Sequence, residues 1–212
     1  MKIALISAFL DEVKVEKLLS YLNTYYDSWV HNLIDFIKWS KNLERVISVF
    51  NLYENDSLHN LLRNLGNIEK LNDYLDISKI SPAILVNTTN TTNLAIVLDN
   101  AKLLNFWMLT DSIDSRKIAY IINNIDDISN FISTIDFMNT VFLSKLIIKW
   151  NNERIANFLN EIDVNCLNDL IEKSTNSYDI FIDKLLLKIS KNWAEKVARI
   201  INDKWRLPNW KD

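Results

Sequence analysis

The side chains of this chain that could carry out chemistry are few and scattered. Its single cysteine is Cys166, and its two histidines are His31 and His59. Protein metal sites use clustered His, Cys and carboxylate ligands at short helical or hairpin spacing, and no recognised metal motif surrounds any of these three residues. We therefore predict no metal site, interpret both histidines as surface or boundary residues, and interpret Cys166 as a small buried hydrophobic residue.

Two other kinds of catalytic pattern are also missing. Paired carboxylates occur at Asp111/Asp114 and Asp126/Asp127, but the N-termini of helices favour these same residues as caps. Phosphate-cradling loops need two or three close glycines, and the chain has one. We predict no catalytic residues and no cofactor.

The C-terminal stretch interleaves basic and aromatic residues in a way that suits binding. Such a stretch can stack on nucleic-acid bases, or dock on an acidic partner or a membrane surface. The alternative is that one tryptophan completes the last helix and the rest is a frayed chain end. The residues of this predicted interaction tail are Lys204, Trp205, Arg206, Trp210 and Lys211.

The composition narrows the architecture that must position these residues. The chain has 212 residues, of which 49% are hydrophobic and 24% are charged, with a formal net charge of -3. It has one glycine and two prolines, which argues against hairpin-rich β structure because tight turns depend on glycine. The abundant Asn and Ile indicate an AT-rich genome. The charge is spread evenly, so nucleic acid is not favoured as a partner.

Hydrophobic periodicity predicts an all-α protein. Apolar residues recur at i, i+3, i+4 and i+7, which places them on one helix face. Successive quartets begin a short distance apart, so we predict about 11–13 short antiparallel helices stacked as irregular helical hairpins, forming either an α-solenoid-like right-handed superhelix or a compact multi-helix bundle. The clearest quartets are Val15/Leu18/Leu19/Leu22, Leu43/Val46/Ile47/Phe50, Leu58/Leu61/Leu62/Leu65, Ile118/Ile121/Ile122/Ile125 and Ile155/Phe158/Leu159/Ile162.

Helix ends can also be read from the sequence. Gly66 follows Leu65 where a left-handed C-cap would sit, and Asn67 can cap the next helix. The segment 86–93 has turn and cap chemistry without periodicity. We therefore predict a single domain over 1–212, with a loop or subdomain boundary near 86–93.

Tryptophans mark a predicted internal repeat. Trp107, Trp150 and Trp193 are spaced by 43 residues, within the range of two- or three-helix solenoid repeats. Segments around Trp39, Trp150 and Trp193 each read as an apolar helix, a lysine-tryptophan corner and a second helix that opens with a basic residue, and a looser copy surrounds Trp107. The alternative is chance alignment of helices with a biased composition.

The segments RKIAYIINNID and RIANFLNEID, which begin at Arg116 and Arg154, share a basic-Ile-Ala-x-x-[Ile/Leu]-Asn-x-x-Asp pattern. This pattern resembles the repeat in the superhelical cytosolic domain of MgtE-type magnesium transporters and related flagellar motor helical domains. The resemblance implies a right-handed stack of short helices. It implies no magnesium ligands, because the chain lacks the transporter's membrane helices and its Glu/Pro-rich helix starts.

Together these patterns favour an interaction protein over an enzyme. Stacked helical hairpins form extended binding surfaces, so we predict a non-catalytic scaffold or adaptor that binds another protein. The alternatives are a helical bundle that binds a small apolar ligand or lipid, with or without enzymatic activity, and nucleic-acid binding through the tail. The apolar run Ile3–Leu10 meets Asp11 at once and no long uncharged apolar stretch is present, so with one cysteine we expect a cytoplasmic protein without a transmembrane segment.

Overall fold

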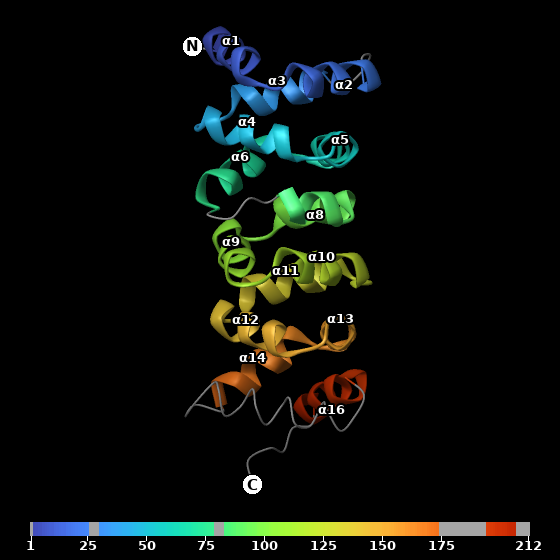
Figure 1. Ribbon diagram of the computed structural model, residues 1–212. Helices are drawn as coiled ribbons and strands as arrows, with labels where there is room; N and C mark the ends of the chain where they lie inside the picture. The colour runs from blue at the N-terminus through green and yellow to red at the C-terminus, as the bar shows by residue number, and fades with distance from the viewer. Residues whose placement is uncertain (1, 26–29, 79–82, 174–193, 207–212) are drawn as a thin grey trace. The chain divides into compact units, whose positions relative to one another are not determined.

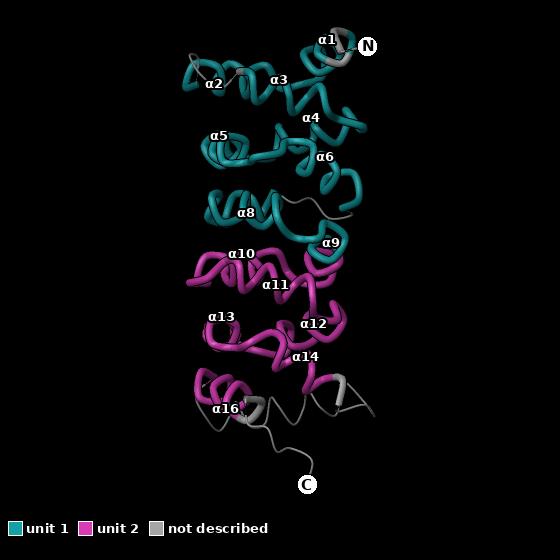
Figure 2. The backbone as a smooth tube through the Cα atoms, turned by 180° about the vertical axis from the view of Figure 1, so that it is seen from behind, with its two compact units in different colours: residues 1–107 teal, residues 108–212 magenta. Residues whose placement is uncertain are grey.

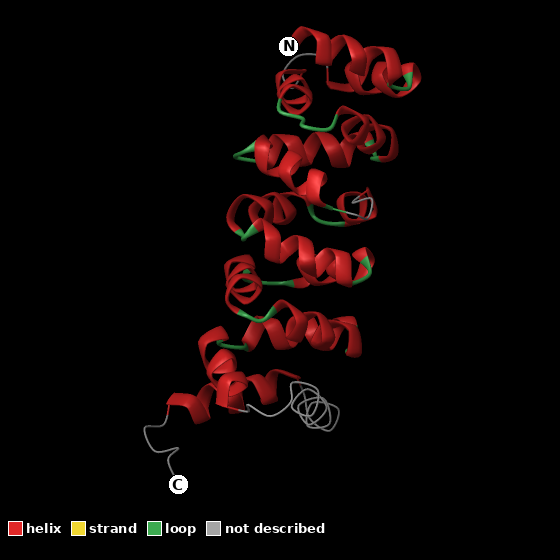
Figure 3. Cartoon of the chain, turned by 90° about the vertical axis from the view of Figure 1, so that its left-hand side faces the viewer, coloured by secondary structure: helices red, strands yellow, loops and turns green. Residues whose placement is uncertain are grey.

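The protein is all-helical wherever its structure is described. The computed structural model describes residues 2–25, 30–78, 83–173 and 194–206, and within these ranges every regular element is an α-helix (Figure 3). The helices are α1 (Lys2–Glu12), α2 (Val15–Tyr25), α3 (Val30–Lys38), α4 (Leu43–Leu52), α5 (Asn55–Asn64), α6 (Ile68–Ile77), α7 (Ala83–Thr88), α8 (Thr91–Asn100), α9 (Leu103–Ser112), α10 (Ser115–Asn124), α11 (Ile128–Phe137), α12 (Thr140–Lys149), α13 (Asn152–Glu161), α14 (Val164–Lys173) and α16 (Ala194–Arg206).

The all-α prediction is confirmed, although the helices are more numerous than the 11–13 expected. The apolar run near the N-terminus forms α1, and the predicted loop at 86–93 is wrong, because it contains the end of α7 and the start of α8 with only Thr89 and Asn90 between them. The polar side chains in this segment serve its helix ends: Asn90 accepts hydrogen bonds from the backbone N–H groups of Thr92 and Asn93 at 3.0 and 3.2 Å.

Side-chain caps explain why the helices are short and regular. Most of them are ten residues long. An Asn or Asp precedes many of them and accepts a backbone N–H from the first turn, which satisfies a donor that has no partner within the helix. These N-caps are Asn42, Asn67, Asn90, Asp114, Asp127, Asn139 and Asn151.

Gly66 does not form the left-handed cap that its position suggests. None of the described residues has a positive φ, and α5 ends at Leu65 in extended backbone. The Gly66 N–H instead donates to the Asp99 carboxylate at 2.6 Å, and a Cβ on Gly66 would lie 3.2 Å from that oxygen. Glycine is therefore used here for close approach of a carboxylate.

One burial pattern recurs in seven of the described helices. In each, the fourth, fifth, seventh and eighth residues are buried, as expected for a helix that packs one face on a core. This confirms the predicted quartets in α4, α5, α10 and α13. The buried sets are Val46/Ile47/Val49/Phe50, Leu58/His59/Leu61/Leu62, Leu71/Asn72/Tyr74/Leu75, Leu94/Ala95/Val97/Leu98, Ile118/Ala119/Ile121/Ile122, Leu143/Ser144/Leu146/Ile147 and Ile155/Ala156/Phe158/Leu159.

The quartet predicted for α2 is wrong. Val15 and Leu19 are 63% and 53% exposed, whereas Tyr21 is fully buried. The Tyr21 ring packs against Phe50 of α4, with ring centroids 5.6 Å apart. A single large aromatic side chain therefore anchors this helix instead of an aliphatic stripe.

The chain divides into two compact units, Met1–Trp107 and Met108–Asp212 (Figure 2). In the first unit, α3 packs on α6 and α5 packs on α8. In the second unit, α10 packs on α13 and α11 packs on α14 (Figure 1). In each of these pairs, the two helices that touch are separated in sequence by two others.

Asparagine side chains join the ends of helices that are distant in sequence. Asn160 accepts the Asp126 N–H at 2.9 Å and donates to the Asn124 carbonyl oxygen at 3.2 Å. Asn202 does the same between Asp163 and Glu161, at 2.9 and 2.7 Å. Each amide thus pairs with the last carbonyl of one helix and with an N–H two residues later.

A third asparagine makes the same bridge in the first unit. Asn87 accepts the Glu54 N–H at 3.0 Å and donates to the Leu52 carbonyl oxygen at 3.5 Å. We call Asn87, Asn160 and Asn202 the bridging asparagines. They occur near the ends of α7, α13 and α16 and fix the connection between two earlier helices.

Basic side chains satisfy further helix C-termini. Lys117, the third residue of α10, donates to the carbonyl oxygens of Ile148 and Trp150 at 3.0 and 2.5 Å. Arg45, the third residue of α4, donates to the Ser78 carbonyl oxygen. The basic residue in the first turn of these predicted second helices therefore has a structural role. It donates hydrogen bonds to carbonyl oxygens at the end of another helix, where the helix itself supplies no donor.

The predicted tryptophan corners do not share one environment. Trp39 and Trp150 both follow directly after a helix, but Trp39 is 47% exposed and Trp150 is 7% exposed. Trp107 lies inside α9 rather than at a corner, so the corner prediction is wrong there. Trp193 lies outside the described residues. Trp150 is buried and packs against Phe158 at a ring-centroid distance of 5.1 Å.

The bridging asparagines give a stability test. Replacing Asn160 by alanine leaves the Asp126 N–H and the Asn124 carbonyl without their side-chain partner, so Asn160→Ala is expected to lower the free energy of unfolding by about 1–3 kcal/mol. The control is Asn165→Ala, an exposed asparagine of the same unit, with an expected change of about 0.5 kcal/mol or less. Urea denaturation followed by circular dichroism measures both, and equal values would contradict the bridging role.

Candidate functional site

The side chains best suited to catalysis or metal binding are not gathered into a catalytic centre in the described part of the chain. The described part of the chain holds no group of three or more His, Cys, Asp and Glu side chains arranged for a metal ion, and none of its helices is long and apolar enough to cross a membrane. His31 is exposed and Cys166 is buried, as predicted. The interpretation of His59 is wrong, because its side chain is only 5% exposed.

The acidic pairs serve mainly as helix caps. Asp114 accepts the Arg116 N–H at 2.8 Å, and Asp127 accepts the Ser129 N–H at 2.9 Å. Asp111, by contrast, lies within α9. Capping therefore accounts for one member of each pair.

The predicted interaction tail is only partly described. The backbone of Lys204, Trp205 and Arg206 continues α16, in agreement with a tryptophan that completes the last helix. Trp210 and Lys211 lie outside the described residues. Binding through this tail stays a prediction.

The first unit contains a cleft that is a candidate binding site. It has a volume of about 350 Å³ and lies between α3 and the connection from α5 to α6. The α3 side is formed by Asn32, Asp35 and Trp39, whose spacing of three and four residues places them on one helix face. The opposite side is formed by residues 65–69. Asn32 donates to the Leu62 carbonyl oxygen at 3.2 Å, which ties α3 to the end of α5.

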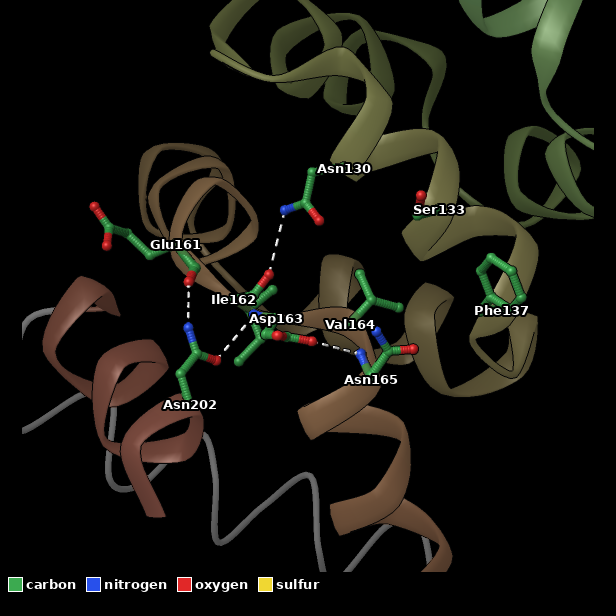
Figure 4. Close-up of a pocket in the computed structure, with 9 residues that line it drawn as sticks. All are labelled: Asn130, Ser133, Phe137, Glu161, Ile162, Asp163, Val164, Asn165 and Asn202. Carbon is green, nitrogen blue, oxygen red and sulfur yellow. Dashed lines mark hydrogen bonds between the residues drawn. The ribbon is translucent and has the colours of Figure 1, made fainter. Parts of the chain in front are cut away.

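A matching cleft lies in the second unit (Figure 4). It has a volume of about 550 Å³, and Asn130, Ser133 and Phe137 of α11 line one side with the same spacing. Residues 161–165 and Asn202 line the rest. Asn130 donates to the carbonyl oxygens of Leu159 and Ile162 at 2.9 and 3.2 Å. We call these two sites the Trp39 cleft and the Phe137 cleft.

The two clefts are built in the same way. In each, an asparagine at the third helix position binds the end of another helix, and an aromatic residue seven positions later forms the rim. Trp39 is 47% exposed and Phe137 is 66% exposed. A second asparagine holds each helix near its C-terminal end. Asn72 donates to the Phe36 carbonyl oxygen of α3 at 2.9 Å, and Asn168 donates to the Phe137 carbonyl oxygen of α11 at 3.1 Å.

Sequence reasoning missed both clefts. It assigned Trp39 to a buried corner and gave Phe137 no role. The signal that could have revealed them is the shared spacing of an asparagine, a small polar or acidic residue three positions on, and an aromatic residue seven positions on.

The clefts differ in charge. The Trp39 cleft carries two carboxylates, Asp35 and Glu69, and no basic residue lines it. Outside the lining, the Nζ of Lys38 lies 3.6 Å from the Asp35 carboxylate. The first cleft is therefore an acidic surface with an exposed indole at its edge.

In the Phe137 cleft both carboxylates are already engaged. The Arg199 guanidinium binds both oxygens of Glu161, at 3.1 and 3.3 Å, and this hydrogen bonding lowers the pKa of Glu161. Asp163 accepts the N–H groups of Asn165 and Cys166 at 2.9 and 3.3 Å as the N-cap of α14. The second cleft therefore has engaged carboxylates and an exposed phenyl ring at its rim.

A separate aromatic cluster surrounds His59. The imidazole stacks on Tyr25 at a ring-centroid distance of 3.7 Å and an interplanar angle of 6°, and the Tyr25 hydroxyl donates to the Asp56 carboxylate. Burial is the main cause that lowers the pKa of His59, with a smaller contribution from the positive charge of Arg63. Burial and the bond to Asp56 raise the pKa of Tyr25 to about 12. These groups stay neutral at pH 7 and act as packing.

Comparisons with known proteins add no assignment. Comparing the chain with protein-family models, with curated proteins and with solved structures gives no match in any of the three. The resemblance to the cytosolic domain of MgtE-type transporters therefore stays a prediction.

His59 yields a pH test. Because the folded protein holds His59 neutral, its contribution to stability is fully present above the unfolded pKa of about 6.5 and is lost as the pH falls below it. His59→Ala should remove this part of the acid sensitivity, and alanine suits the site because α8, α10 and α13 carry alanine at the same position.

The measurement is the midpoint of urea unfolding at pH 7 and pH 5 for both proteins. We expect a larger fall between the two pH values in the wild type than in the variant. An equal fall would show that His59 titrates normally in the fold.

Proposed function

We propose that the chain is a non-catalytic protein-interaction module of helical-repeat type, which binds an exposed segment of a partner protein at the Trp39 and Phe137 clefts. The observation that carries the proposal is the recurrence of one cleft design with a half-exposed or mostly exposed aromatic ring at its rim. Aromatic side chains dominate the binding energy of protein interfaces. Two such rings at equivalent helix ends favour recognition over chance exposure.

The walls of the Trp39 cleft suit a peptide chain better than a lipid. Asp35 and Glu69 line this cleft, and their carboxylates can accept hydrogen bonds from the N–H groups of an extended segment. An apolar ligand there would remove the carboxylates from water without a partner, at a cost in free energy. The alternative of a bundle that binds a small apolar ligand or lipid is therefore less favoured at the Trp39 cleft.

The cysteine content supports a proposal about the cellular setting. Cys166 is the only cysteine and is buried, which suits a reducing compartment such as the cytoplasm. We therefore propose a cytoplasmic partner protein.

The proposal is tested by selecting binders from a library of random peptides displayed on phage, with the purified protein as bait. Enriched sequences are made synthetically and titrated calorimetrically. We expect Trp39→Ala or Phe137→Ala to weaken binding about tenfold or more, because truncating a central interface aromatic removes most of its contribution.

Leu19→Ala and Ile148→Ala serve as matched controls. These side chains are 53% and 54% exposed and line neither cleft, so their loss should leave the affinity unchanged. The proposal fails if no sequence is enriched, or if the double variant Trp39→Ala/Phe137→Ala binds as well as the wild type.

A further inference from the structure

We propose that the Trp39 cleft recognises an arginine side chain of the partner segment, while the Phe137 cleft receives an apolar one. This inference rests on the proposed function and adds the chemistry of the ligand. It is carried by the difference between two clefts of otherwise equal design.

The indole of Trp39 supplies a face for a guanidinium. Among aromatic side chains, tryptophan attracts cations most strongly, and the planar guanidinium of arginine stacks on such rings. Trp39 is 47% exposed at the end of α3, so a large part of its surface is open to a ligand.

The carboxylates of the same cleft supply the charge. Asp35 lies one helical turn before Trp39, and Glu69 lies in the first turn of α6 on the opposite side. An arginine on the indole can therefore hydrogen-bond to a carboxylate while it stacks, which a lysine cannot do with the same planar geometry. Lys38 lies 3.6 Å from Asp35, but a partly exposed pair of this kind is weak and can be replaced.

In the Phe137 cleft, an arginine of the chain itself already pairs with a carboxylate of the cleft wall. Arg199 of α16 forms a two-pronged contact with Glu161 at the cleft wall, at 3.1 and 3.3 Å. Asp163 is used to cap α14. With both acidic groups engaged, the feature left for a ligand is the phenyl ring of Phe137, which is 66% exposed. An apolar side chain is the group that gains most from covering it.

The experiment compares two peptides that differ in one charge. The probe is an eleven-residue peptide, acetylated and amidated, of sequence GSALARALASG, and its partner carries citrulline in place of arginine. Citrulline keeps the shape and planarity of arginine without the charge. Calorimetric titration should show the arginine peptide binding the wild-type protein about tenfold more tightly.

The variants assign this preference to one cleft. Asp35→Asn/Glu69→Gln and Trp39→Ala should each bring the ratio of the two affinities to less than about twofold. Phe137→Ala changes the cleft of the other unit and should leave the ratio unchanged. Raising the salt concentration should weaken only the arginine peptide, because its charge pairing lies at an exposed surface.

The inference is overturned if the two peptides bind equally, if neither binds, or if Asp35→Asn/Glu69→Gln keeps the full preference. These results separate it from the proposed function. Binders from the peptide library that depend on Trp39 but tolerate citrulline would leave the interaction module in place and remove the arginine preference alone.

Discussion

The arrangement of helices in this protein depends on the need to form hydrogen bonds with the backbone groups at helix ends. A helix leaves four N–H groups and four carbonyls without partners inside it, so in helices of ten residues about two fifths of the backbone donors and acceptors must find a partner elsewhere. The N–H groups are met by a side chain just before the helix, as at Asp114 and Asp127. Many of the carbonyls are met by side chains from another helix, and among the described residues these long-range bonds span 29 to 41 residues of sequence. Each helix therefore depends on another for completion, and the packing of α5 on α8 or of α10 on α13 is joined by hydrogen bonds as well as by apolar contact.

The two clefts are a consequence of this arrangement. Asn32 and Asn130 occupy the third position of their helices and reach across to the end of a neighbouring helix, which opens a recess beside the bond. The same helix face carries an aromatic residue seven positions later, and an asparagine of a further helix holds the carbonyl near that aromatic residue. The end of each of these two helices is thus held through backbone carbonyls. An aromatic side chain in a fixed position loses little freedom on binding, which is why such residues act as anchors at interfaces.

The sequence predicted the helices because their cores are repetitive, and it failed where single contacts decide. The quartets in α5, α10 and α13 are confirmed, since aliphatic residues at helical spacing have one efficient way to be buried. The quartet in α2 is wrong because Tyr21, one large ring, outweighs the smaller residues beside it.

The segment 86–93 is predicted as a loop or a subdomain boundary because its threonines and asparagines favour helix caps. Asn90 does cap α8, but α7 and α8 share so short a connection that almost no loop is left. The spacing from asparagine to aromatic residue marks α3 and α11 in the sequence, but placing the clefts also requires knowing which helix end lies opposite them.

The hydrogen bonding also explains why recognition is favoured over catalysis. A catalytic side chain must be held in place while its functional group stays available to a substrate. In the described parts of this chain, many of the polar side chains with the best geometry are already committed to backbone groups: Asn160 and Asn202 use both ends of their amides, Lys117 serves two carbonyls, and Asp163 caps a helix. The groups exposed at the two clefts include an indole, a phenyl ring and the carboxylates of the first cleft. Such groups can hold a side chain by stacking and charge. The codon bias of an AT-rich genome can supply abundant asparagine, and in this protein many asparagine side chains connect one helix to another. The exposed aromatic residues Trp39 and Phe137 lie at the ends of helices that such bonds hold together.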